Sequence, residues 1–313
     1  MRRLQIGWIR LAPLVLAAVL AACGSTVARA GSASSGGTGT TAPGPGASKL
    51  AVVATTTQVS DFVRLVGGDT VQVYAILKPN VDAHDVETSP ADLEAIRGAS
   101  LVVENGAGLE PWLSKAMSAA GTKATLVDSS AGVALHGDDP HIWHDPRNAK
   151  QMVTNIEHAL EAADPASATV FATNAAAYRG ELDTLDRDIE TELSTLTNRK
   201  LVSNHDAFGY YVARYGLTFV GSVIPSFDSQ AELSATELQR LVERISAEGV
   251  KAVFSETSLP SKTAETIAEE AGVKVVEGAD ALYGDSLGPA GSSGDTYLKM
   301  MRHNTDTIVE NLR

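Results

Sequence analysis

From residue 49 onward, short apolar runs alternate with stretches in which apolar residues recur every three or four positions. The runs at 49–55, 71–77, 101–104 and 124–127 predict buried strands, and helical patterns follow at 59–66, from Ser89 and from Leu109. Strands that alternate with helices predict a parallel sheet covered by helices on both faces. Ligands of such sheets bind beyond the carboxyl ends of the strands.

The same pattern starts again after residue 200. A strand at Leu201-Val-Ser leads into a turn with His205, a helix through Phe208 and Tyr211, and a strand at 217–221. Further strands are expected at 252–255 and 273–276, with helices between them. We therefore expect a second lobe built on the plan of the first.

A long amphipathic stretch lies between the two patterns. Its apolar residues are spaced by three or four throughout: Phe171, Ala175, Tyr178, Leu182, Leu185, Ile189, Leu193 and Leu196. One helix over residues 165–196 would be roughly 45 Å long. It could be an ordinary surface helix, but its place between the lobes favours a connector. We expect an α/β fold with two lobes, 48–164 and 198–313, each a parallel sheet flanked by helices, joined by one long rigid connector helix at 165–197.

The N-terminus has the pattern of an export signal. Arg2, Arg3 and Arg10 precede an apolar run at 11–20, which is too short to span a membrane and ends in Leu20-Ala-Ala-Cys23. This ending resembles a bacterial lipobox. The resemblance implies a signal peptide at 1–22, lipidation of Cys23, and anchoring to the outer face of the bacterial cell membrane. The alternative is a free thiol beside a signal sequence. Residues 24–47, rich in Gly, Ser, Thr, Ala and Pro, predict a flexible tether.

Charge and cysteine content exclude several classes of function. The formal net charge is −13, and residues 1–47 carry four arginines and no acidic residue. The rest of the chain therefore carries −13 − 4 = −17, and nucleic acid is not expected as a partner of so acidic a chain. Cys23 is the only cysteine, which leaves no partner for a disulfide. The chain has no phosphate-binding loop of the G-x-x-x-x-G-K-[ST] type. We expect a monomer that does not itself hydrolyse ATP.

Three histidines and one aspartate stand in short polar turns that are far apart in the sequence: His84, His141, His205 and Asp285. Imidazole nitrogens with one carboxylate oxygen suit Zn²⁺, which takes four such ligands in a tetrahedron. A small structural zinc module would gather its ligands within a few turns. The wide separation of the four residues therefore predicts a metal site in a cleft between lobes. Asp280 is close to Asp285 in the sequence and could be the ligand in its place.

The motifs around these residues are specific: Asp82-Ala-His84 with Glu87, Asn105-Gly-Ala-Gly-Leu-Glu110-Pro-Trp112, Asp139-Pro-His141-Ile-Trp143, His205-Asp-Ala-Phe-Gly-Tyr, and Gly294-Asp-Thr-Tyr-Leu-Lys-Met-Met. Over residues 49–313 the chain resembles the cluster A-I solute-binding lipoproteins of zinc and manganese ABC importers. The resemblance implies one metal between two lobes, held by His84, His141, His205 and Asp285, and delivery to a separate permease and ATPase. Manganese members tend to carry a carboxylate where this chain has His205, which favours zinc; Mn²⁺ is the alternative ion.

Other polar residues are candidates for supporting roles. His144 replaces a residue that is usually apolar in the family, and with His136 it could bind metal as an auxiliary ligand or remain an uncoordinated imidazole. Candidates to orient the ligands from outside are Asp85, Asp145, Asn204, Asp206 and Glu256.

A surface adhesin remains an alternative function. A zinc hydrolase is disfavoured because H-E-x-x-H is absent. We expect release of the metal to require movement of the loop at 82–88 or of that at 280–295.

Overall fold

The sheet of the first lobe is built from short apolar strands. The computed structural model of the chain describes residues 49–231 and 234–313; the predicted signal peptide, Cys23 and the tether lie outside the described residues. β1 (Leu50–Ala54), β2 (Val71–Ala75), β3 (Leu101–Glu104) and β4 (Thr125–Asp128) pair in parallel in the order β2-β1-β3-β4. The helices α1 (Thr57–Gly67), α2 (Pro90–Gly98) and α3 (Leu113–Ala120) connect them.

The second lobe repeats this arrangement. β5 (Lys200–His205), β6 (Thr218–Ile224), β7 (Ala252–Phe254) and β8 (Lys274–Val276) pair in parallel in the order β6-β5-β7-β8. They are connected by α6 (Gly209–Tyr215), α7 (Ala235–Glu248) and α8 (Lys262–Ala271). The strand order is the same in both lobes, so the predicted two-lobe α/β architecture is confirmed.

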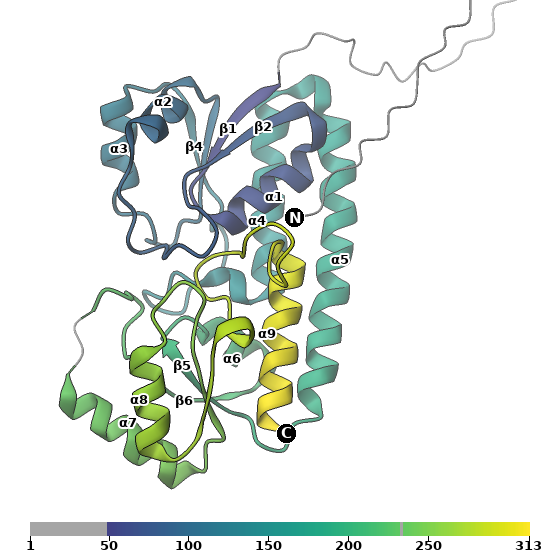
Figure 1. Cartoon of the computed structure of the whole chain (residues 1–313). Helices are drawn as coiled ribbons and strands as arrows, with labels where there is room; N and C mark the ends of the chain where they lie inside the picture. Colours follow the sequence, from purple (N-terminus) through teal and green to yellow (C-terminus); the bar gives the residue numbers. More distant parts are fainter. Residues whose placement is uncertain (1–48, 232–233) are drawn as a thin grey trace, which may run out of the picture. The chain divides into compact units, whose positions relative to one another are not determined.

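Three longer helices join the lobes. α4 (Pro146–Ala163) and α9 (Tyr297–Leu312) both pack against α5 (Ala168–Ser194), which runs alongside both lobes in Figure 1. α5 has 27 residues, so it is about 40 Å long. The expected connector helix is present, but residues 165–167 form a separate 3₁₀ turn before it. The exact lobe boundaries stay a prediction.

The two lobes share a hydrophobic core, and each lobe also has a smaller cluster of its own. A single cluster of buried side chains contains Val52 and Phe62 of the first lobe, Leu185 of α5, and Tyr211 and Met300 of the second part of the chain. The Phe62 ring of α1 lies 5.0 Å from the ring of Tyr297 at the start of α9. A continuous core of this kind opposes a wide hinge motion between the lobes.

One predicted helix starts later than expected. We expected a helix from Leu109, but α3 begins at Leu113. Pro111 disfavours the helical conformation for the residue before it, and Glu110 instead uses its side chain to accept hydrogen bonds from the backbone of Asn105 and Gly106. The segment therefore forms a turn that closes on itself. Within the described ranges, no helix is both long and apolar enough to cross a membrane.

Candidate metal centre

The carboxyl ends of the strands deliver the four candidate ligands to one place. His84 follows β2 and His141 follows β4 in the first lobe, whereas His205 ends β5 and Asp285 follows β8 in the second. In an open parallel sheet this edge is where ligands bind, because the strand order reverses there and leaves a crevice. Each lobe thus contributes two of the four residues from this edge of its sheet.

The side chains of these four residues converge. One ligand atom from each can be chosen so that all lie within 4.8 Å of one another. Nε2 of His141 lies 3.1 Å from Nε2 of His84 and 3.3 Å from Nε2 of His205, and Oδ1 of Asp285 lies 3.4 Å from Nε2 of both His141 and His205. Tetrahedral zinc with bonds of about 2.0–2.1 Å separates its ligand atoms by roughly 3.3 Å. These four separations therefore fit a four-coordinate ion, whereas Nε2 of His84 lies farther, 3.9 Å, from Oδ1 of Asp285.

Two carboxylates fix the orientation of two of the imidazoles. Nδ1 of His141 lies 2.7 Å from Oδ1 of Asp139, and Nδ1 of His205 lies 2.9 Å from Oε1 of Glu256. An Nδ1–H that donates to a carboxylate leaves Nε2 as the unprotonated nitrogen of a neutral ring. Lone pairs on these rings then face one another and the carboxylate of Asp285, an arrangement that a bound cation would stabilise.

Burial and charge act together on the ionisation of the centre. Side chains of His141, His205 and Asp285 are fully buried, and that of His84 is 10 % exposed. Burial lowers the pKa of His205, but the carboxylates of Glu256 and Asp285 outweigh it and raise this pKa well above the usual value. Burial raises the pKa of Asp285, yet His205 and His141 hold it well below its usual range. A metal ion must therefore displace a proton, so acid should weaken binding.

Residues of the first lobe hold the Asp285 loop. Gln58 Nε2 donates to the Asp285 carbonyl (3.1 Å), and Trp143 Nε1 donates to the Gly284 carbonyl (3.1 Å). A Cβ at Gly284 would overlap the Glu256 carboxylate, so glycine is needed for this close approach. Among the described residues, no side chain or backbone group donates a hydrogen bond to the buried carboxylate oxygens of Asp285.

A small opening leads from solvent to His84. It has a volume of about 200 Å³ and is lined by His84, Gly108, Leu109, Pro111, Asp138, Pro140, Phe227 and Asp228. Below it, the buried carboxylate of Glu110 accepts hydrogen bonds from Thr55 Oγ1 (2.6 Å) and from the backbone N–H groups of Asn105 (2.7 Å) and Gly106 (3.1 Å). These bonds shape the loop that forms one wall of the opening.

The two candidate auxiliary histidines are not part of the cluster. His144 is fully buried, and its ring lies 4.5 Å from that of Phe208. Burial lowers its pKa to about 3, so a neutral imidazole fills a place suited to an apolar residue. His136 is exposed and stacks on Tyr210 at 4.2 Å. Asp280 is also exposed and outside the cluster, whereas Asp285 belongs to it.

The candidates for supporting roles have different surroundings. Glu256 contacts His205 as described above, whereas Asp85 is exposed. Asp145 caps α4 by accepting from the backbone N–H of Arg147, Asn204 donates weakly to the carbonyl of Pro260 (3.5 Å), and Asp206 receives no hydrogen bond on its carboxylate from a described residue. Asp139 was quoted in the motif around His141 but was not among the predicted supporting residues. Its position two residues before His141 was the available signal, because aspartate readily bonds to the backbone two residues on.

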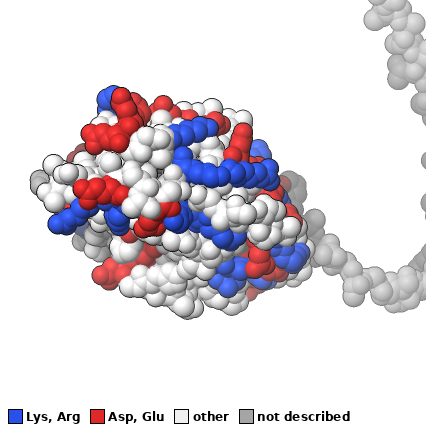
Figure 2. Space-filling model, turned by 90° about the horizontal axis from the view of Figure 1, so that it is seen from below, with Lys and Arg blue, Asp and Glu red and all other residues white. Residues whose placement is uncertain are grey.

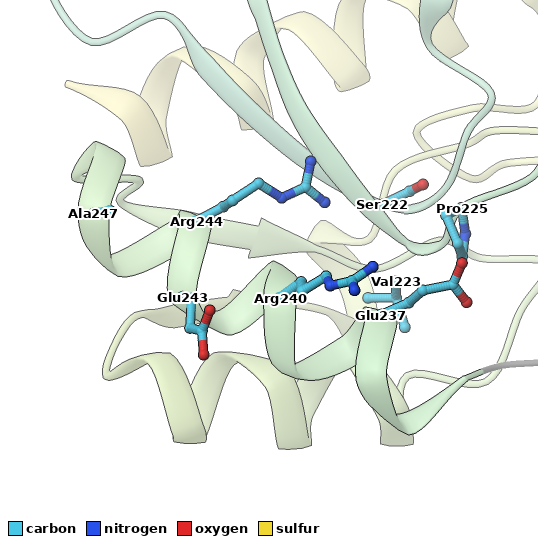
Figure 3. Close-up of a pocket in the computed structure, with 8 residues that line it drawn as sticks. All are labelled: Ser222, Val223, Pro225, Glu237, Arg240, Glu243, Arg244 and Ala247. Atoms are coloured by element: carbon cyan, nitrogen blue, oxygen red, sulfur yellow. The ribbon is translucent and has the colours of Figure 1, made fainter.

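A separate surface hollow lies elsewhere and has different chemistry. It is a groove of about 590 Å³ between β6 and α7. Figure 3 shows the guanidinium groups of Arg240 and Arg244 extending from α7 toward the strand residues. Glu237 and Glu243 also line the groove, so its charges are mixed, and none of its lining residues belongs to the His/Asp cluster. Figure 2 shows basic and acidic side chains interspersed on the face that it presents, so the acidic net charge does not form a continuous field there.

Comparison with known proteins places this geometry in a family. Residues 52–311 match the family described as "Zinc-uptake complex component A periplasmic", ZnuA. The chain belongs to the ZnuA family. Its members are metal-binding solute-binding proteins of ABC importers rather than enzymes, which removes the hydrolase alternative.

Individual relatives of this ZnuA-family chain differ in the metal that they are named for. The "Manganese-binding lipoprotein MntA" of Bacillus subtilis is 31 % identical over 295 residues, covering 88 % of this chain and 94 % of the relative. The "Zinc-binding protein TroA" of Treponema pallidum is 30 % identical over 273 residues, with 83 % and 88 % covered. A solved structure of the periplasmic zinc-binding protein TroA aligns with a TM-score of 0.79 at 28 % identity, covering 85 % of this chain and 99 % of that one.

The contact between Glu256 and His205 can be tested without removing a candidate ligand. We expect Glu256→Gln to weaken zinc binding by about 10- to 100-fold, because the neutral amide no longer fixes and polarises the His205 ring. Calorimetric titration of the metal-free protein measures the change. Glu248→Gln, at an exposed position near the end of α7, is the matched control. Equal affinities of the two variants would contradict the role.

Proposed function

We propose that this protein is an extracytoplasmic Zn²⁺-binding protein that captures zinc between its lobes and delivers it to the permease of an ABC importer. The observation that carries the proposal is the convergence of three imidazole nitrogens and one carboxylate oxygen within 4.8 Å. Three nitrogens and one oxygen at this spacing suit tetrahedral zinc. The proposed ligands are Nε2 of His84, His141 and His205 and the carboxylate of Asp285.

The proposal includes the way in which the protein reaches its partner. Lipidation of Cys23 would anchor the chain to the outer face of the cell membrane, and residues 24–47 would give the binding unit reach toward the permease. The relative from Bacillus subtilis is itself named a lipoprotein. Mass spectrometry of the membrane fraction, compared with a Cys23→Ala variant, tests the anchor. A wild-type protein that is released unlipidated into the medium would contradict it.

Manganese is the second candidate ion, and relatives named for manganese favour it. Calorimetric titration of the metal-free protein with Zn²⁺ and with Mn²⁺ in parallel separates the candidates. We expect one Zn²⁺ per chain, bound more tightly than Mn²⁺, because imidazole-rich sites favour zinc. Tighter binding of Mn²⁺ would overturn the choice of metal, and absence of tight binding by either ion would overturn the receptor function.

A further inference from the structure

The loop that carries His84 is held from the opposite lobe through Asp82. Oδ1 of Asp82 accepts a hydrogen bond from the backbone N–H of His84 (2.8 Å). Its Oδ2 accepts from Ser229 Oγ (2.5 Å) and from Gln230 Nε2 (3.0 Å). One buried carboxylate therefore connects the backbone of a proposed ligand in the first lobe to two side chains of the second. We call the hydrogen bonds from Ser229 and Gln230 to Asp82 the clasp.

The segment that supplies the clasp also contacts the neighbourhood of His205. Residues 226–231 follow β6, and the carbonyl of Ser226 accepts a hydrogen bond from the backbone N–H of Asp206 (3.2 Å), the residue after His205. Phe227 and Asp228 of this segment line the opening above His84. The segment thus extends from one proposed ligand to the loop of another and forms part of the wall between the centre and solvent.

The clasp differs from the contacts that hold the Asp285 loop. That loop is bound by Gln58 and Trp143, whose side chains are fully buried. The clasp includes Gln230, which is exposed, and it positions His84, the one of the four clustered side chains that solvent reaches. Water can replace a hydrogen bond at an exposed donor at little cost, whereas a buried donor loses its partner entirely. The His84 loop is therefore easier to open than the Asp285 loop.

We infer that Asp82, Ser229 and Gln230 are positioning residues that keep His84 in place as a ligand, and that opening of the clasp sets the rate at which the metal leaves. The inference rests on the proposed function. It assigns release to the side of the centre that already faces solvent. The core shared by the two lobes supports a local movement of this kind, because a wide separation of the lobes would expose it.

Dissociation of zinc from the purified protein tests the inference. Zn²⁺-loaded protein is mixed rapidly with an excess of a chromophoric chelator, and the rate of zinc loss is measured for wild type, Ser229→Ala and Gln230→Ala. We expect each variant to release zinc faster, by about tenfold for Ser229→Ala, because a hydrogen bond to a charged acceptor is lost. The association rate should change less, since the four proposed ligands remain.

Two controls separate positioning from a general structural role. Ser226→Ala removes a hydroxyl of the same segment that bonds to the N–H of Asp228 and not to Asp82, so its release rate should equal that of wild type. In an Asp82→Ala background, which keeps all four proposed ligands, Ser229→Ala should no longer accelerate release, because the carboxylate that Ser229 bonds is gone. A purely structural effect of Ser229→Ala would persist in that background.

The outcomes distinguish this inference from the function on which it rests. Wild-type protein that takes up no zinc would overturn the proposed function, and the inference with it. Wild type that holds zinc, with Ser229→Ala and Gln230→Ala releasing it at the wild-type rate, would overturn the clasp alone. Equal acceleration by Ser226→Ala, or an undiminished effect in the Asp82→Ala background, would do the same.

Discussion

Replacing His205 with alanine should abolish tight zinc binding. The side chain is fully buried, and its Nε2 lies 3.3 Å from Nε2 of His141 and 3.4 Å from Oδ1 of Asp285. Alanine would leave three of the four proposed ligands, and its methyl group cannot replace the missing nitrogen. Loss of a residue that merely orients a ligand costs roughly 10- to 100-fold in affinity, so loss of the ligand itself should exceed about 100-fold.

Calorimetric titration of the metal-free protein measures this loss. His158→Ala is the matched control, since His158 is an exposed histidine of α4 outside the cluster. It should bind zinc as wild type does. Affinity within threefold of wild type in His205→Ala would remove His205 from the ligand set. Loss of affinity in both variants would show that the effect does not come from the centre.

The second large effect that we expect is a fall in the stability of the metal-free protein as the pH rises, caused by Glu110. Burial raises the pKa of Glu110 from 4.5 to about 7, although hydrogen bonds from Thr55 and Asn105 oppose the rise. Between these two pH values the folded state holds more protons than the unfolded state, so stability falls with rising pH. Above pH 7 the contribution of Glu110 to the free energy of unfolding, about 3 kcal/mol, is lost completely.

Urea unfolding of wild type and Glu110→Gln at several pH values from 4 to 8, with a chelator present, measures this contribution. Glutamine stays neutral throughout, so the variant lacks the contribution of Glu110 to the pH dependence while keeping the other titrating groups. The stability of wild type relative to the variant should therefore decrease across the window. A constant difference from pH 4 to pH 8 would show that Glu110 does not titrate in the predicted way.

Much of the fold could be predicted because its causes are local. Apolar runs such as that at 101–104 and the amphipathic spacing of α5 report burial directly, and Ser89 caps α2 at the position where a helix was expected. The convergence of the proposed ligands could be anticipated from motif spacing together with the rule that ligands lie beyond the carboxyl ends of parallel strands.

Other features depend on side-chain directions that spacing does not reveal. His144 is three residues from His141, but the intervening 3₁₀ turn (Ile142–His144, η2) directs it against Phe208 rather than into the cluster. Ser229 meets Asp82 across 147 positions of sequence, and nothing in the pattern around residue 229 indicates a partner. Contacts of this kind arise from the docking of two complete lobes, so no local rule predicts them.

The core that both lobes share has a consequence for the way in which the protein unfolds. Side chains of α5 pack into the same cluster as Phe62 on one side and Tyr211 on the other. Melting of one half would therefore expose apolar side chains of the other, so the shared core should be lost in one cooperative step under heat or denaturant. A fragment cut within α5 would expose apolar surface that has no other cover, so the two lobes are halves of one folding unit rather than separable modules.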